Sequence, residues 1–139
     1  MNIDHATWSL FVFMVFWVLR ALNDRLAMKF KQIKKNREFV RGYKRGDCYI
    51  YPELVIYILK NSYGEIRTGI TSSKKTGNAV KRNRSRRVLR RALDRISFDR
   101  NQGFDIILVS RGKTAHVKSH QITPLIMERM TRSGIIYDQ

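Results

Sequence analysis

One stretch of basic residues with helical spacing most constrains how this chain folds. Positions 74 to 95 contain ten Lys or Arg residues and one Asp. Projected at about 100° per residue, the apolar residues of the stretch fall on one arc and most of its arginines on the opposite arc. The apolar arc consists of Val88, Leu89, Ala92, Leu93 and Ile96. This pattern predicts a helix that packs on a core through one side and presents cations on the other.

The charge of the whole chain indicates the class of partner. The 139 residues include 28 basic and 11 acidic side chains, a net charge of +17, which is far more than solubility requires. The charges within residues 1–27 cancel, so the whole surplus lies in residues 28–139. Such a surplus favours nucleic acid as the partner.

Residues 28–139 are long enough to bury one core, so we expect a single RNA-binding domain there. The lone Cys48 cannot form an internal disulfide, and no Cys/His cluster has zinc-site spacing. These features favour a reducing, cytoplasmic setting. We expect the Cys48 thiol to act as a small packing residue.

The N-terminal residues 1–27 form a segment of a different kind. The stretch Leu10–Leu19 is wholly apolar, but Arg20 ends it short of the roughly 20 residues that span a membrane. The positive region of a secretory signal is also missing before it. An interfacial or buried apolar helix is one interpretation. We prefer an upstream extension outside the fold, with the working protein beginning at Met28, and we expect no stable membrane anchor.

The first half of the domain reads as a short helix followed by strands. Residues 36–44 have helical apolar spacing that Gly46 closes, and Gly42 should shorten this helix because glycine costs about 1 kcal/mol relative to alanine. The β-branched and aromatic run 54–59 is followed by an Asn-Ser-Tyr-Gly turn and by residues 65–70. We predict that these two runs form an antiparallel pair.

The second half alternates helices with one strand. The basic helix should begin at about Asn78, a good N-cap, and end near Ser97. The apolar run 104–110 has turns on both sides and is expected to be a buried central strand. The dipeptide Thr123-Pro124 suits the start of a last helix, which Gly134 ends.

The predicted order is αββαβα, or αβββαβα with a further strand near Tyr49. Pro52 should mark an edge or a bulge after that strand.

A longer pattern of residues resembles a known family. Its signature is Ser73-Lys74-Lys75, Gly77, Ala79-Val80 and Arg82-Asn83-Arg84, followed by Arg86-Arg87 and Leu89-Arg90. This signature resembles that of the bacterial ribonuclease P protein component, and the likeness extends over roughly residues 28–134. It implies an α+β fold, a ribosomal protein S5 domain 2-like sandwich with a central, mostly antiparallel sheet. It also implies a left-handed β-α-β crossover around the basic helix, an exception to the usual hand.

The resemblance implies a subunit of ribonuclease P. Such a subunit binds the catalytic RNA and the 5′ leader of precursor tRNA and promotes endonucleolytic maturation of the tRNA 5′ end. The chemistry then belongs to RNA and Mg²⁺, held mainly by the RNA subunit and the substrate, and the protein carries no catalytic residue. Two alternatives stay open: a basic ribosomal protein of the same fold, and a membrane-tethered nucleic-acid binder anchored by Leu10–Leu19.

A search of the residues for catalytic chemistry agrees with that expectation. Only nine acids follow residue 27, and no Ser/His/Asp set, paired carboxylates or Gly-rich phosphate loop stands out. His116 and His120 are four residues apart but lack a third ligand nearby. We therefore expect a solvated pair and no metal site.

The resemblance assigns RNA contact to residues of the basic segment. The central ones are Arg82, Asn83 and Arg84, and the supporting cations are Lys74, Lys75, Arg86, Arg87 and Arg90. Arginine suits bidentate phosphate contact better than lysine does. The alternative is a solvated helix face, but like charges this dense repel one another unless an anion neutralises them.

The resemblance assigns leader binding to three aromatic residues, Phe39, Tyr43 and Tyr57. Aromatic rings stack on any base, at about 1 to 3 kcal/mol per base, and so grip an unpaired strand without demanding sequence. The alternative is plain core packing, which the same spacing would give. Exposure of the rings discriminates, because a stacking platform must show one face to solvent.

Overall fold

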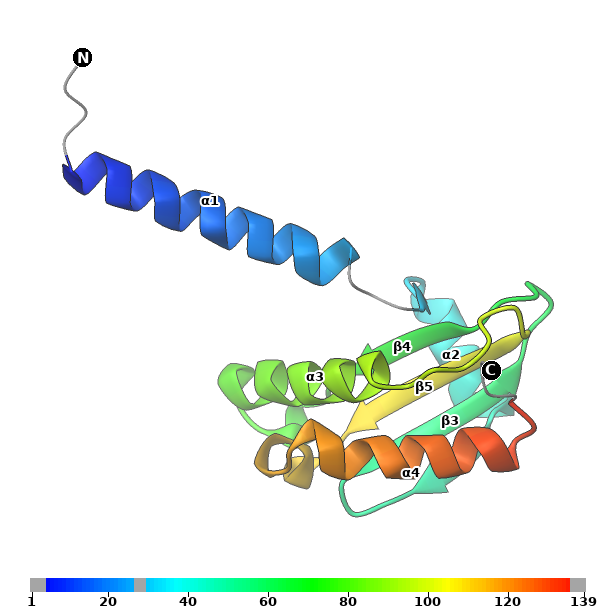
Figure 1. The fold of residues 1–139 in the computed structure, drawn as a ribbon. Helices are drawn as coiled ribbons and strands as arrows, with labels where there is room; N and C mark the ends of the chain where they lie inside the picture. Colours follow the sequence, from blue (N-terminus) through cyan, green and yellow to red (C-terminus); the bar gives the residue numbers. More distant parts are fainter. Residues whose placement is uncertain (1–4, 27–29, 136–139) are drawn as a thin grey trace.

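The structure, a computed structural model, describes residues 5–26 and 30–135 and contains one mixed sheet with helices on both faces (Figure 1). The helices are α1 (His5–Leu26), α2 (Asn36–Arg45), α3 (Ala79–Asp94) and α4 (Ser119–Arg132), with short 3-10 turns η1 (Lys74–Thr76) and η2 (Gly112–His116). The strands are β1 (Lys31–Gln32), β2 (Asp47–Ile50), β3 (Leu54–Lys60), β4 (Arg67–Thr71) and β5 (Phe104–Ser110). From β1 onward the order matches the predicted αβββαβα with one short strand added in front.

The sheet has the order β1-β4-β5-β3-β2, with β5 at its centre as predicted for residues 104–110. Strand β3 pairs antiparallel with β2 and β5, while β4 pairs parallel with β5 and β1. The predicted antiparallel pair of residues 54–59 with 65–70 is therefore wrong. Strand β5 separates the two, because it is apolar towards both faces and is best buried between two neighbours.

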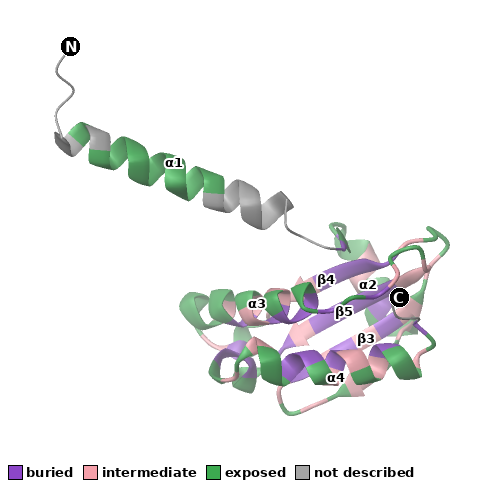
Figure 2. Ribbon diagram, in the orientation of Figure 1, coloured by how far each residue is buried: buried purple, intermediate pink, exposed green. Residues whose placement is uncertain are grey.

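The two faces of β5 belong to different layers. Ile106 and Leu108 join the main core with α3 and α4, whereas Ile107 between them faces α2. Helices α3 and α4 lie side by side over one face of the sheet, and α2 lies behind the other (Figure 1). Figure 2 shows the buried residues along the strands and on the sides of α3 and α4 that face them.

The ends of α3 and α4 test the predicted helix signals. Asn78 caps α3, since its Oδ1 accepts the Lys81 N–H at 3.0 Å, but the helix stops at Asp94, short of Ser97. Helix α4 begins at Ser119, one turn before the predicted start at Thr123. The Thr123 hydroxyl lies 3.0 Å from the Ser119 carbonyl and 3.3 Å from the Ala92 carbonyl, so it ties α4 to α3 instead of capping.

The predicted stop of the last helix at Gly134 is confirmed. This residue has the positive φ of 87° that glycine tolerates best, and its N–H donates to the Thr131 carbonyl.

Helix α2 runs its full length to Arg45, so the predicted shortening at Gly42 is wrong. A Cβ placed on Gly42 would lie only 2.3 Å from Ile107 Cδ1. Glycine therefore lets α2 approach the sheet closely, and that packing offsets its low helix propensity.

Cys48 is exposed on β2, contrary to the predicted packing role. Pro52 lies in the connection between β2 and β3.

The described apolar side chains in the middle of helix α1 are exposed. Those of Leu10–Leu19 are between 38% and 71% exposed. No helix in the described part of the chain combines the length and the apolar character needed to cross a membrane. The predicted start at Met28 lies outside the described residues.

Candidate nucleic-acid interface

The arginines of α3 form two rows on opposite flanks of the helix. Ser85, Leu89, Ala92 and Leu93 are buried against the core and separate the two rows. The β4-side row consists of Arg82, Arg86 and Arg90, spaced by four residues and all half-buried. The α4-side row consists of Arg84, Arg87, Arg91 and Arg95, all exposed. One helix thus offers two separate cationic surfaces.

The β4-side row contains buried donors that lack acceptors. The Nε atoms of Arg82 and Arg90 are buried and have no hydrogen-bond partner in the described residues. A buried donor without an acceptor costs about 1 to 3 kcal/mol, so an incoming oxyanion would recover that free energy. Arg90 also lines a hollow together with Phe39 and Gly69.

The remaining residues predicted for RNA contact lie around this row. Lys74 and Lys75 are exposed in η1, immediately before α3. Asn83 is exposed and its Oδ1 accepts a long hydrogen bond from Arg86, at 3.4 Å. Arg84 and Arg87 belong to the α4-side row. The predicted set therefore shares one helix and the turn before it but not one surface.

The structure brings together the three aromatic residues predicted for leader binding. The rings of Tyr43 and Tyr57 meet edge to face with centroids 5.1 Å apart. Phe39, one helical turn before Tyr43, lies against Gly69, where an added Cβ would be 2.5 Å from the ring. Tyr43 is 39% exposed, while Phe39 and Tyr57 are half-buried. The rings pack on the sheet and still leave part of their surface accessible.

The surroundings of Tyr57 favour the neutral phenol, the form that tyrosine already has near neutral pH. Interaction with the side chain of Cys48, its partner across the β2–β3 pair, raises the pKa of the Tyr57 phenol, and burial raises it further. An uncharged ring does not repel the phosphates of a nucleic acid. The hydroxyl of Tyr43 is likewise fixed, 3.2 Å from Thr71 Oγ1.

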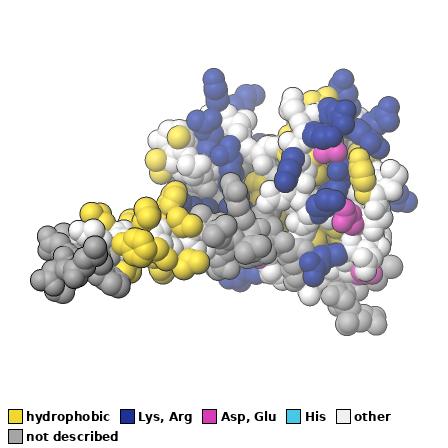
Figure 3. Space-filling view, turned by 90° about the horizontal axis from the view of Figure 1, so that it is seen from above, with side chains coloured by type: hydrophobic (Ala, Val, Ile, Leu, Met, Phe, Trp, Pro, Cys, Tyr) yellow, Lys and Arg dark blue, Asp and Glu magenta, His cyan; other side chains and the backbone are white. Residues whose placement is uncertain are grey.

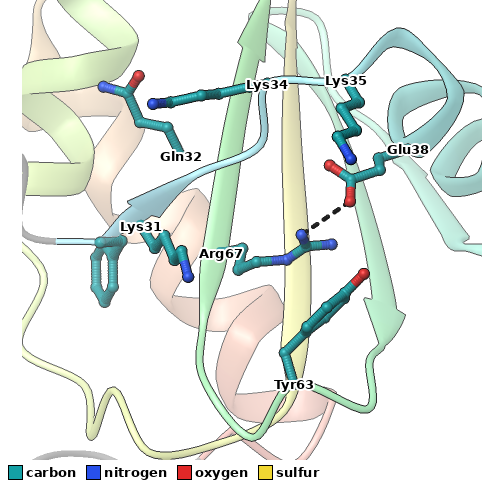
Figure 4. Close-up of a pocket in the computed structure, with 8 residues that line it drawn as sticks. Lys31, Gln32, Lys34, Lys35, Glu38, Tyr63 and Arg67 are labelled. Carbon is teal, nitrogen blue, oxygen red and sulfur yellow. Dashed lines mark hydrogen bonds and ion pairs between the residues drawn. The ribbon is translucent and has the colours of Figure 1, made fainter.

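A second basic pocket, which the sequence patterns did not reveal, lies beside the start of α2 (Figure 4). Lys31, Lys34 and Lys35 reach it from the segment before α2, and Tyr63 from the loop before β4. Its inner wall is Arg67 of β4. The sequence offers little signal for this pocket, because Arg67 is only the first residue of a short strand that also contains two threonines.

Arg67 is the centre of a buried ion cluster. Its Nε and Nη2 donate to the two carboxylate oxygens of Asp105 at 2.9 and 2.8 Å, and its Nη1 donates to Glu38 at 3.0 Å. The Tyr63 ring stacks on the guanidinium, 4.0 Å from its carbon. The hydrogen bonds to Asp105 raise the pKa of Arg67 above its ordinary value, against the opposing effect of burial. This cluster joins α2 to β4 and β5 and so fixes the helix that carries Phe39 and Tyr43.

Basic side chains dominate the face of the domain seen in Figure 3. Figure 3 shows Lys and Arg side chains over the visible face of the domain with few acidic ones among them, and hydrophobic side chains gathered on α1.

The salt bridges within residues 30–135 include none of the α3 arginines. The described residues also contain no group of three His, Cys, Asp or Glu side chains able to hold a metal ion.

These features define a class, a strongly basic α+β sandwich protein. The sequence model of the Ribonuclease P family matches residues 27–132. The chain therefore belongs to the ribonuclease P protein family, which confirms the resemblance inferred from the sequence.

Named relatives support the assignment. The ribonuclease P protein component of Thermoanaerobacter sp. (strain X514) is 37% identical over 110 residues, covering 76% of this chain and 95% of the relative. That of Clostridium botulinum (strain Loch Maree / Type A3) is 34% identical over 110 residues, covering 78% and 98%. The solved Staphylococcus aureus RNase P protein superimposes with a TM-score of 0.62 at 30% identity, covering 78% of this chain and 99% of that structure.

Membership has two direct consequences. The ribonuclease P protein component is a subunit of a ribonucleoprotein endoribonuclease, and its partner is the ribonuclease P RNA. The likeness to the Staphylococcus aureus protein also confirms the predicted α+β fold.

Proposed function

We propose that this chain binds the catalytic RNA of ribonuclease P and the 5′ leader of precursor tRNA, and thereby promotes endonucleolytic maturation of the tRNA 5′ end in the cytoplasm. The observation that carries the proposal is the pair of buried Nε atoms in Arg82 and Arg90, which have no hydrogen-bond partner among the described residues, together with the hollow that Arg90 shares with Phe39. Cations beside aromatic platforms are the combination that single-stranded RNA binding uses.

A path of neighbouring residues links Arg90 to the aromatic rings. Arg90 shares a hollow with Phe39, Phe39 lies one turn from Tyr43, and Tyr43 contacts Tyr57. Guanidinium groups along this path would meet phosphates, and the rings would stack on bases. The buried ion cluster of Arg67 holds α2, which carries two of the rings, in place.

Mg²⁺ enters this proposal only through the RNA. The described residues form no carboxylate or imidazole cluster that could cage the ion. We propose that the RNA subunit and the substrate hold it. The protein residues bind and orient RNA and carry no catalytic group.

Reconstitution tests the proposed function. The full chain, added to a bacterial ribonuclease P RNA, should lower the Mg²⁺ concentration that the RNA needs to cleave precursor tRNA, because the cations of the protein replace part of the ionic screening. The protein without RNA should leave precursor tRNA intact. Cleavage by the protein alone, or no effect on the RNA, would contradict the proposal.

Arg82→Ala should weaken binding to the ribonuclease P RNA by about 1 to 3 kcal/mol, because it removes a charge-assisted contact. Filter binding at fixed salt measures the change. Arg132→Ala is the matched control, since Arg132 is exposed in the last turn of α4 and its salt bridge joins it to Glu128 of the same helix. Equal losses in both variants would show that overall charge, and not the β4-side row, determines affinity.

Tyr43→Ala should reduce the preference of the holoenzyme for precursor over mature tRNA by about 1 to 3 kcal/mol, the stacking free energy of one base. Tyr43→Phe should keep that preference, because it removes only the hydroxyl bonded to Thr71. Comparison of the dissociation constants for both tRNA forms gives the result. A loss of preference in Tyr43→Phe as large as in Tyr43→Ala would assign the role to the hydroxyl instead of the ring.

A further inference from the structure

Thr76 is the only buried residue between Gly69 and Ser85, in the stretch that leads from β4 into α3. It belongs to the single turn η1 and is 4% exposed, while Lys74 and Lys75 in the same turn are exposed. The placement of both lysines therefore depends on how this one side chain is held. On the basis of the function proposed above, we propose that the Thr76 hydroxyl is a positioning group, which orients Lys74 and Lys75 toward RNA phosphates.

A chain of three hydroxyl groups holds Thr76. Its Oγ1 lies 3.0 Å from Ser110 Oγ at the end of β5, and the Ser110 hydroxyl donates to Ser72 Oγ at 2.8 Å. Because that second bond uses the Ser110 proton, the Thr76 hydroxyl is the donor to Ser110. Thr76 Oγ1 also lies 3.4 Å from the Ser110 carbonyl oxygen. The chain thus ties η1 to the last residue of the central strand and to the residue after β4.

The backbone hydrogen bonds of this turn are local. The Thr76 N–H donates to the Ser73 carbonyl at 3.0 Å, and the Gly77 N–H donates to the Lys74 carbonyl at 3.2 Å. Gly77 then redirects the chain with a positive φ of 131°, and α3 begins two residues later at Ala79. These bonds shape the turn but do not attach it to the sheet. The Thr76 hydroxyl makes that attachment.

A hydroxyl fixes a direction that an apolar side chain does not. Burial of an apolar group is favourable in any orientation that removes it from water, whereas a hydrogen bond requires a distance and an angle. Lys74 and Lys75 make no salt bridge within the described ranges, so no ion pair orients them. Each lysine has a flexible stem, so the fold can direct only the root of the side chain. The hydroxyl chain fixes that root through the rotation of a three-residue turn.

The test begins with Thr76→Val in the full chain, because valine has nearly the shape of threonine and lacks the hydroxyl. Affinity for a bacterial ribonuclease P RNA is measured over a series of salt concentrations. The variant should lose about threefold to tenfold in affinity, the effect of one hydrogen bond. It removes no charge, yet its salt slope should become shallower by about one unit, because a misdirected lysine no longer displaces counterions. Thr76→Ser, which keeps the hydroxyl, should restore both values.

Two further variants separate positioning from stability. Ser110→Ala removes the acceptor on β5 and leaves η1 itself unchanged, so it should give the same loss, and the double variant with Thr76→Val should lose no more. Thr123→Val is the matched control, since its buried hydroxyl also joins two elements, near the C-terminal end of α3 and not at η1. This control should keep the affinity and the salt slope of the unmodified chain. Circular dichroism checks that each variant is folded.

Several results would overturn the proposal. An unchanged salt slope in Thr76→Val would do so, as would an equal loss in Thr123→Val. Additive losses in Thr76→Val and Ser110→Ala would show that the two hydroxyls act separately. If Thr76→Val does not fold, Ser110→Ala applies the same test from outside η1. Failure of the unmodified chain to bind the RNA would reject the proposed function, whereas binding without the change in slope would reject only the positioning role.

Discussion

Arg67→Ala should lower the free energy of unfolding by about 3 to 5 kcal/mol, the range expected when one partner of a buried ion pair is removed. The Arg67 and Asp105 side chains are 9% and 7% exposed, so in the folded protein their ionic contacts take the place of hydration by bulk water. Asp105 would retain one side-chain donor, the Asn61 amide at 2.7 Å. Glu38 would lose its partner as well, which loosens α2 and the rings it carries.

Urea unfolding followed by circular dichroism measures this effect. Lys31→Ala is the control, because the Lys31–Glu65 pair has a similar distance, 2.8 Å, but lies at the surface with 64% and 39% exposure. Its loss should cost less than about 1 kcal/mol. Similar costs for the two variants would mean that the Arg67 cluster contributes no more than a surface pair.

Affinity for the ribonuclease P RNA should fall roughly a thousandfold between about 50 and 200 mM monovalent salt. The two arginine rows with Lys74 and Lys75 offer enough cations for about six phosphate contacts, and each contact releases bound counterions from the RNA. The logarithm of the binding constant should therefore fall steeply and linearly with the logarithm of salt concentration.

The same titration with Arg82→Ala should give a slope shallower by about one unit, because one phosphate contact is lost. Arg132→Ala should leave the slope unchanged. A nearly flat dependence in the unmodified protein would show that apolar or base contacts, and not phosphates, provide most of the affinity.

Local signals in the sequence were sufficient to locate the helices and the strand that carry the candidate site. Asn78 followed by a helical apolar stripe located α3, and the apolar run of β5 located the centre of the sheet. Helical spacing also predicted that Phe39 and Tyr43 share a side of α2. In each case the deciding interactions lie within one turn of helix or one strand.

The features that the sequence did not predict depend on contacts between residues far apart in the chain. Strands β3 and β4 are neighbours in sequence, yet β5 from later in the chain takes the position between them. Thr123 was predicted as a helix cap because it precedes Pro124. Its hydrogen bond to the Ala92 carbonyl joins two helices and has no local signature in the sequence. The charge partners of Arg67 lie 29 and 38 residues away. The division of the α3 arginines into two rows depends on α4, which packs beside one flank of α3. Helical spacing alone could not predict it.

The exposed thiol on β2 gives experiments a ready attachment point. Cys48 is the only cysteine in the chain, and it sits directly opposite Tyr57 in the strand pairing. A maleimide fluorophore would therefore couple at one defined position, at the margin of the aromatic group, without any prior mutagenesis. Quenching of such a dye by an arriving oligonucleotide would report occupancy of that face in real time.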